Sequence, residues 1–204
     1  NGFLHPDILV KGKPGDRLVQ GYVLPTYEQE TRVGAGAYTA LVIAAQGIGC
    51  SLLDRVGTDV YGEMTMSALK ERGLDLSGID RYPGAHMFCL SIVDETGEGG
   101  TMVINYPEPW RRDIQSFRRE LTGASSPSIY LYSWYWSFAH PELAKSTTSD
   151  LARIAASDGK TVLLDFNYKP AALPPANDME QLRLAAPHVD VLMPNVRDAA
   201  LMVG

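Results

Sequence analysis

The sequence has few of the residues that build disulfide frameworks or metal sites. It contains two cysteines and four histidines in 204 residues. Cys50 and Cys89 lie far apart and form no CxxC pair, which indicates neither a disulfide framework nor a zinc site. The histidines are scattered without the spacing of metal ligands. We therefore expect a protein of a reducing compartment, the cytoplasm.

A basic face and a long apolar run are missing as well. The formal net charge is −6, and no nucleic-acid partner is expected because binding to phosphates needs clustered Lys and Arg. No stretch of about 20 apolar residues exists, so no segment is expected to span a membrane. The chain starts at Asn1 without methionine or a signal peptide and stops where a helix has just ended, so we expect a fragment.

The composition that is present is that of a globular protein, with 45% hydrophobic and 21% charged residues. From residue 50 onward, predicted strands and helices mostly alternate, and the later strands are continuous apolar runs. This pattern predicts a parallel sheet covered by helices on both faces. The expected helices span residues 37–49 (small, apolar and buried on every side), 60–72, 111–121, 141–156 and 179–186, and the expected strands 50–56, 128–134, 161–167 and 189–195.

Two segments do not fit this alternation. Residues 7–33 are rich in strand-forming residues, and residues 86–106 form two strands around the glycine-rich turn "ETGEGG". We expect them to form a separate small sheet at one edge of the domain.

Glycine and acid are concentrated at the start of the helix predicted for residues 60–72, in "RVGTDVYGE". Asp59 is placed to accept hydrogen bonds from backbone N–H groups at the positive end of this helix. Gly57 and Gly62 indicate a link that turns sharply or packs closely against other backbone. A structural role for this segment is favoured over a chemical one.

The stretch "GAGAYTALVIAAQGIGCSLLDRV" allows a dinucleotide-binding interpretation, which would make the protein an NAD(P)-dependent dehydrogenase. Gly34 and Gly36 open a helix, and Asp54 lies near the expected spacing. Thr39 stands at the third glycine position, however, and the residues before the glycines, "YEQETR", are too charged for a buried central strand.

Five short motifs in a fixed order point elsewhere. They are "HPDILV" with Asp7, "GAGAYT" with Gly34 and Gly36, "GTDVYG", "DFNYKP" and "MPNVRDA". In this order they resemble the PfkB (ribokinase-like) family of carbohydrate kinases over nearly the whole chain. The resemblance implies a single three-layer α/β domain over residues 1–204, incomplete at its C-terminus, with a β lid from about residues 7–33 and 86–106.

The resemblance also implies a function. It predicts ATP-dependent phosphorylation of a hydroxymethyl group of a sugar or nucleoside, with ATP and Mg²⁺ as cofactors and a possible homodimer through the β lid. The alternative is a sugar- or nucleoside-binding relic or sensor that has lost catalysis. This alternative is supported by departures from the family pattern at Thr39, Lys169 and Asp198.

By the same resemblance, one group of residues would bind the substrate. Asp7 would accept two sugar hydroxyls, and Gly34 and Gly36 would bring backbone N–H groups to the same sugar. Thr39 replaces the family's asparagine and keeps one donor and one acceptor. Lys169 replaces an arginine, so it attracts an anion without bidentate geometry. The predicted substrate-binding residues are Asp7, Gly34, Gly36, Thr39, Asn167 and Lys169.

Further candidate residues follow the last two predicted strands, and of these Asn195 and Asp198 would bind the cofactor. Asp165 and Asn167 alternate to one face at a strand's carboxyl end, where open α/β sheets bind ligands. Asn195 would orient phosphate or metal-bound water, and Asp198 would lie near magnesium in place of the family's glutamate. The residues themselves leave an equal alternative, in which Asn195 caps a helix and Asp198 occupies its first turn.

No catalytic residue is predicted. The family's catalytic motif is G-A-G-D, whose aspartate is the general base, and "VGAGAYT" contains its first three letters with no Asp after them. We therefore expect the 204-residue chain by itself to transfer no phosphate.

Overall fold

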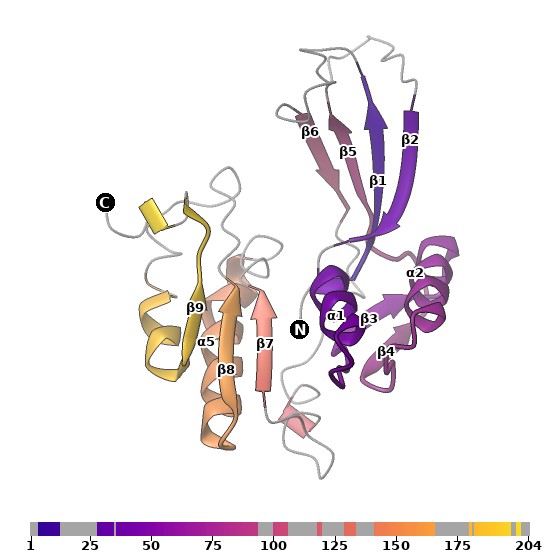
Figure 1. Cartoon of the computed structure of the whole chain (residues 1–204). Helices are drawn as coiled ribbons and strands as arrows, with labels where there is room; N and C mark the ends of the chain where they lie inside the picture. The colour runs from indigo at the N-terminus through magenta and orange to yellow at the C-terminus, as the bar shows by residue number, and fades with distance from the viewer. Residues whose placement is uncertain are drawn as a thin grey trace. The chain divides into compact units, whose positions relative to one another are not determined.

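The computed structural model describes residues 4–12, 28–34, 36–93, 100–105, 118–119, 129–133, 141–165, 180, 182–196 and 199–200. The chain divides into two compact units (Figure 1). The N-terminal unit is Leu4–Arg111, and the C-terminal unit is Arg112–Gly204 together with Asn1–Phe3. That residues 1–204 form a single domain stays a prediction.

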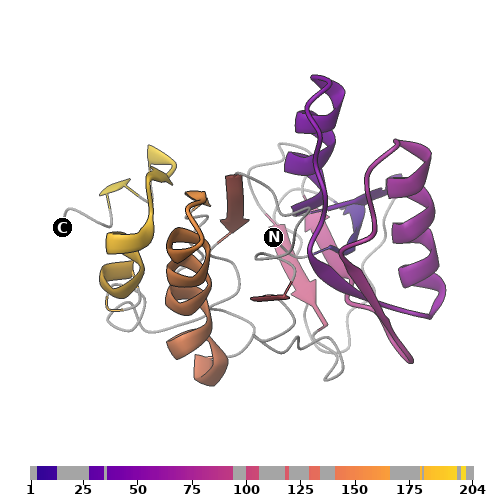
Figure 2. The same cartoon turned by 90° about the horizontal axis from the view of Figure 1, so that it is seen from below.

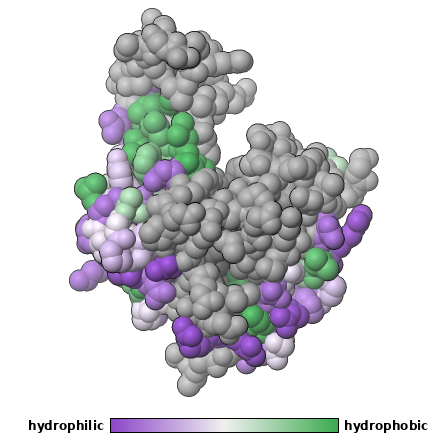
Figure 3. Space-filling model, turned by 180° about the vertical axis from the view of Figure 1, so that it is seen from behind, coloured by the Kyte–Doolittle hydropathy of each residue, from purple (hydrophilic) through white to green (hydrophobic). Residues whose placement is uncertain are grey.

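A four-stranded sheet in the N-terminal unit is built from the two segments that did not fit the α/β alternation. Its order is β2-β1-β5-β6, with β1 antiparallel to β2, β1 parallel to β5, and β5 antiparallel to β6. The strands are β1 Pro6–Lys11, β2 Glu28–Val33, β5 Cys89–Val93 and β6 Gly100–Ile104. The separate small sheet predicted from the sequence is therefore confirmed, and Figure 3 shows hydrophobic side chains exposed over it.

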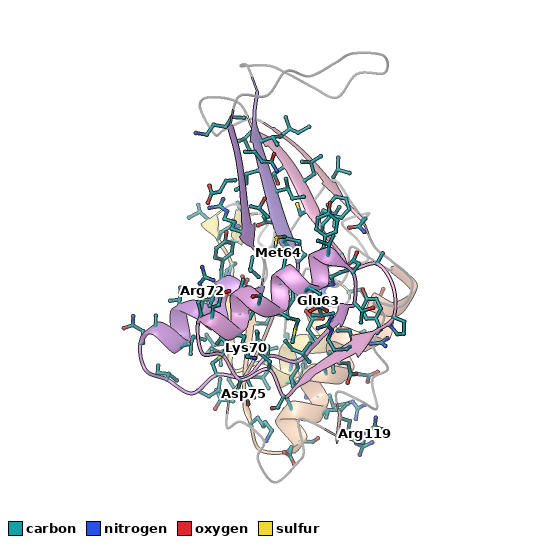
Figure 4. The ribbon with its side chains drawn as sticks, turned by 90° about the vertical axis from the view of Figure 1, so that its right-hand side faces the viewer. Glu63, Met64, Lys70, Arg72, Asp75 and Arg119 are labelled. Carbon is teal, nitrogen blue, oxygen red and sulfur yellow. The ribbon has the colours of Figure 1, made fainter. Side chains whose placement is uncertain are left out.

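The rest of the N-terminal unit contains a parallel strand pair, β3 (Asp54–Gly57) and β4 (Ile79–Tyr82), connected by α2 (Val60–Glu71). Glu63 lies near one end of α2 and Arg72 near the other (Figure 4). β4 was not predicted, because "IDRY" has no apolar run. The apolar core of this region consists of Leu4, Val33, Ala37, Ala40, Leu52, Val56, Leu69 and Leu74.

Helix α1 (Gly36–Ala45) was expected to be buried on every side, and that expectation is wrong. Ala37 is 0% exposed, whereas Val42 is 64% exposed. The helix packs through the small side chains of Ala37 and Ala40, which permit close approach, and Leu41 is partly buried against the same core. Tyr38 and Val42 are exposed. An all-apolar sequence has no polar face to mark this orientation.

The C-terminal unit contains the parallel sheet β7-β8-β9, covered by a long helix (Figure 2). Val162 and Leu164 of β8 are buried, as are Leu151, Ala152, Ile154 and Ala155 of the helix. The predicted alternation of strand and helix is therefore confirmed here. The elements are β7 Ile129–Ser133, α5 Pro141–Ser157, β8 Thr161–Asp165, the 3-10 turn η2 Ala186–His188 and β9 Val191–Met193.

Two predicted helices fall partly outside the described residues. The helix expected at residues 111–121 is described only at 118–119, where it is helical, and the helix expected at 179–186 is helical at 180 and 182–185. In the described ranges, no helix combines the length and the apolar character that crossing a membrane requires.

Candidate functional site

The link from β3 to α2 is packed as tightly as its glycines indicate. The Asp59 side chain caps α2 by accepting a hydrogen bond from the Gly62 N–H at 3.0 Å. A β-carbon on Gly62 would overlap the Gly57 carbonyl, and one on Gly57 would lie 2.7 Å from the Gly84 carbonyl oxygen. The structural role predicted for this segment, with Asp59 as the helix cap, is confirmed.

Asp7 and Gly34 are brought together in the N-terminal unit. Asp7 is the second residue of β1, and its side chain is 20% exposed. A β-carbon built on Gly34 would lie 2.6 Å from Oδ1 of Asp7. Only glycine therefore leaves room for the carboxylate in this position.

The backbone of Gly34 is itself used inside the protein. Its N–H donates to the carbonyl oxygen of His5 at 2.7 Å. The His5 carbonyl oxygen therefore competes with a sugar for this N–H. The remaining contribution of Gly34 to the site is the space that it leaves for the Asp7 carboxylate.

Gly36 and Thr39 lie in the first turn of α1, where N–H groups have no partner within the helix. Gly36 follows Gly34 by two residues, so the two Cα atoms are at most about 7 Å apart. Thr39 is exposed. The start of α1 thus adds backbone donors close to the Asp7 carboxylate.

Two further side chains, which the sequence interpretation missed, lie near this carboxylate. Arg32 is the cross-strand partner of Asp7, and its guanidinium carbon lies 5.7 Å from the centre of the Tyr38 ring. The pKa of the Tyr38 hydroxyl is raised, mainly by desolvation, while Arg32 lowers it and Asp7 raises it. Pairing β1 with β2 in the sequence would have placed Arg32 beside Asp7.

The two buried histidines of this unit, His5 and His86, were noted in the sequence only as scattered. His5 Nδ1 lies 3.2 Å from Asp7 Oδ1. His86 is 0% exposed, and its Nδ1 accepts a hydrogen bond from the Gly57 N–H at 3.3 Å. Burial lowers the pKa of His86 to about 4, so this imidazole is neutral at pH 7. For His5 the sequence did contain a signal, because positions 5 and 7 share one face of an extended strand.

The dinucleotide interpretation fails on topology. It requires a strand, a helix and a second parallel strand in one sheet, but β2 and β3 belong to different sheets. Asp54, the residue expected to bind a ribose, is 3% exposed. Its Oδ2 accepts a hydrogen bond from the Leu4 N–H at 2.8 Å, so this carboxylate is part of the core.

The C-terminal unit brings the carboxyl ends of β7, β8 and β9 to one edge of its sheet. Ser133, Asp165 and Met193 pair in register at the carboxyl ends of β7, β8 and β9. Asn195 follows β9 and is exposed, and its carbonyl oxygen accepts a hydrogen bond from the Ala199 N–H at 2.8 Å. Such a bond is typical of a helix N-cap, which supports the capping interpretation of Asn195.

Three predicted site residues, Asn167, Lys169 and Asp198, lie outside the described residues. Asp198 was the residue predicted to lie near magnesium. In the described ranges, no three His, Cys, Asp or Glu side chains are grouped so that they could hold a metal ion.

The chain resembles solved structures along almost its whole length. A fructokinase from Xylella fastidiosa is 21% identical to the chain, with a TM-score of 0.68. The match covers 94% of this chain and 59% of the fructokinase. A 2-dehydro-3-deoxygluconokinase from Thermotoga maritima is 18% identical, with a TM-score of 0.73, and the match covers 97% of this chain and 60% of that kinase. Arabidopsis thaliana ribokinase complexed with ribose and ATP is 19% identical, with a TM-score of 0.69, and the match covers 98% of this chain and 60% of the ribokinase.

At such identities these likenesses show the fold, and the predicted ribokinase-like α/β architecture is confirmed. The chain spans about 60% of the length of these proteins. No curated protein matches its sequence. The model of the pfkB family carbohydrate kinases matches residues 23–204. The chain therefore belongs to the PfkB family of carbohydrate kinases.

Proposed function

We propose that the whole protein carrying this chain is a cytoplasmic kinase that transfers the γ-phosphoryl group of ATP to a hydroxymethyl group of a sugar or nucleoside. Membership of the PfkB family supports the reaction class. The observation that carries the proposal for this chain is the contact between the Asp7 carboxylate and Gly34. It is a partly exposed carboxylate held so close to Gly34 that a β-carbon at that residue would displace it.

Asp7 has the chemistry that a polyol requires. An ionised carboxylate only accepts hydrogen bonds, and its two oxygens can take neighbouring hydroxyls of one sugar. A carboxylate held in one orientation fixes the sugar and thereby lowers the entropic cost of bringing the reacting hydroxyl to the phosphate.

The first turn of α1 would complete the sugar contacts. The N–H of Gly36 and the hydroxyl of Thr39 are donors that suit the oxygen atoms of a polyol. Asn167 and Lys169 belong to the same proposal, with Lys169 directed at an anionic group. The four-stranded sheet would act as a lid that excludes water, and as the surface of a homodimer.

The nucleotide would bind at the carboxyl edge of the β7-β8-β9 sheet. Asp165 ends β8 at this edge, and Asn195 stands at the N-terminus of a helix, a position that suits phosphate groups. Asn195 and Asp198 would hold ATP and its Mg²⁺. When bound, magnesium neutralises charge on the phosphates.

The test is an assay coupled to ADP release, run on the whole protein with a panel of sugars, sugar acids and nucleosides. We expect turnover with at least one of them and a loss of about a hundredfold in kcat/KM in Asp7→Asn. Asp150→Asn, on the exposed side of α5, is the matched control and should retain activity. Sugar binding without any turnover would favour the non-catalytic sensor, and no binding of any polyol would contradict both functions.

A further inference from the structure

His5 is a buried imidazole placed beside the Asp7 carboxylate. The residue is 4% exposed, and its Nδ1 lies 3.2 Å from Oδ1 of Asp7. In the described part of the chain, this nitrogen has no partner with hydrogen-bond geometry. A buried polar atom left without a partner destabilises the fold, so its retention needs a reason.

The backbone around His5 is fixed on both sides. The N–H of Leu4 donates to Oδ2 of the buried Asp54 at 2.8 Å, and the carbonyl oxygen of His5 accepts from the N–H of Gly34 at 2.7 Å. The imidazole is therefore anchored to the core of the N-terminal unit. Nδ1 and Oδ1 of Asp7 already lie at hydrogen-bond distance, so aligning an Nδ1–H with Oδ1 requires a change in the orientation of the ring and not in the distance.

The Asp7 carboxylate is thus confined by two groups. The Cα of Gly34 lies so close that a β-carbon there would overlap the carboxylate, and the His5 imidazole reaches it through Nδ1. A carboxylate held in this way has few orientations left, and the lone pairs that His5 does not use stay available.

We propose that His5 is a positioning residue, which fixes the orientation of the Asp7 carboxylate for sugar binding by donating a hydrogen bond from Nδ1–H. The inference rests on the proposed function, in which Asp7 binds the sugar. His5 transfers no proton in this role and contacts no reacting atom. Its loss weakens sugar binding and leaves the binding of ATP unchanged.

The first experiment measures steady-state kinetics of the whole protein with His5→Phe and His5→Asn. Phenylalanine keeps a ring but has no donor, whereas the side-chain amide of asparagine can place an N–H near the position of Nδ1. For His5→Phe we expect a KM for the sugar raised about tenfold, with kcat within threefold and the KM for ATP unchanged. His5→Asn should return the sugar KM to within threefold of the unchanged protein.

Two results would overturn the inference. One is a His5→Phe variant that keeps the sugar KM of the unchanged protein. The other is equal impairment in both variants, because a role in packing alone does not depend on a donor. The Asp7→Asn variant distinguishes a failure of this inference from a failure of the proposed function. If Asp7→Asn leaves the sugar KM unchanged, the proposed sugar site is wrong, but if only His5→Phe is without effect, the inference alone fails.

A second measurement decides the matter even if His5→Phe does not fold. ¹⁵N NMR of the unsubstituted protein with labelled histidine reports which ring nitrogen carries a proton. We expect Nδ1 of His5 to be protonated at pH 7 and its resonance to move in Asp7→Asn. An unprotonated Nδ1 would contradict the inference, since it could not donate to a carboxylate.

Discussion

The two units of the chain differ in what they bury. Among its described residues, the N-terminal unit buries the polar or charged side chains of His5, Asp54, Thr65 and His86. In the described part of the C-terminal unit, the only buried charged residue is Lys160, whose Nζ pairs with the partly exposed carboxylate of Asp158 at 2.8 Å. The other buried residues described in this unit are apolar and belong to α5, to β8 and to the helical residues 182–185.

The difference has a physical meaning. Burying a polar group costs free energy unless it is hydrogen-bonded, and apolar side chains of similar size would stabilise the fold as well. Polar groups are therefore retained where their orientation matters. In the N-terminal unit they lie around Asp7 and the Gly57–Gly62 link, so we expect this unit to depend more on glycine positions and on pH than the C-terminal unit does.

The largest effect is expected for Gly62→Ala. Its β-carbon would overlap backbone atoms of Gly57, which cannot move aside as a side chain can. We expect a loss of about 3 kcal/mol in the free energy of unfolding, measured by urea titration, with faster hydrogen exchange in α2. Gly159→Ala is the matched control in the C-terminal unit, where φ is +73° with no atom nearby, and should cost about 1 kcal/mol. Equal losses would remove the difference between the units.

Gly34→Ala should damage function more than stability. The added methyl group displaces the Asp7 carboxylate, and a misplacement of about 1 Å at a binding group reduces kcat/KM by roughly a hundredfold. Steady-state kinetics with the preferred sugar measures this loss, and the KM for ATP should not change. A Gly34→Ala protein with unaltered sugar kinetics would show that Asp7 does not bind the sugar in this position.

The pH dependence of stability tests the buried His86. Burial is the main cause of its pKa of about 4, although Asp59 raises this pKa and His5 and Arg81 lower it. The unfolded value is about 6.5, so the unfolded chain binds more protons between these values, and stability is lost as pH falls from about 6.5 towards 4.

The size of this effect is about 2 kcal/mol at pH 4.5. His86→Asn keeps an acceptor for the Gly57 N–H and removes the titration, so its free energy of unfolding should fall less over the same range. Urea titrations at pH 7 and pH 4.5 measure the difference. Parallel pH profiles for the two proteins would assign the acid sensitivity to other groups.

The smallest effect is expected for Asp59→Ala. Loss of the N-cap of α2 should cost about 1 kcal/mol. Asp150→Ala removes an exposed i,i+3 ion pair with Arg153 in α5 and should cost less than about 0.5 kcal/mol. Thermal unfolding of both variants compares a cap with a surface pair, and a larger loss from Asp150→Ala would contradict this ranking.

The sequence predicted the helices and strands better than it predicted which strands pair with each other. The alternation in the C-terminal unit and the hairpin of β5 and β6 are strong local patterns, and both are confirmed. The parallel pairing of β1 with β5 joins residues about 80 positions apart, as in Asp7 with Cys89, and no local pattern encodes it. β4 was missed because a short strand with exposed charged residues does not stand out.

The sequence predicted only those site residues that belong to a family motif. Asp7, Gly34 and Gly36 came from the family resemblance, and the structure brings Asp7 and Gly34 into contact. Arg32 and His86 match no motif, and Tyr38 lies in "GAGAYT" without an assigned role. Arg32 is placed beside Asp7 by the register of β1 on β2, and His86 is placed at Gly57 by the packing of the segment after β4. Both are tertiary properties.

The central claim is that Asp7, held against Gly34, binds the sugar. A crystal structure of the whole protein with the sugar it phosphorylates tests this most directly. The account predicts two sugar hydroxyl oxygens within about 3 Å of the Asp7 carboxylate oxygens, with the sugar beside the first turn of α1. A sugar bound in another part of the protein, with Asp7 touching only protein or solvent, would contradict it.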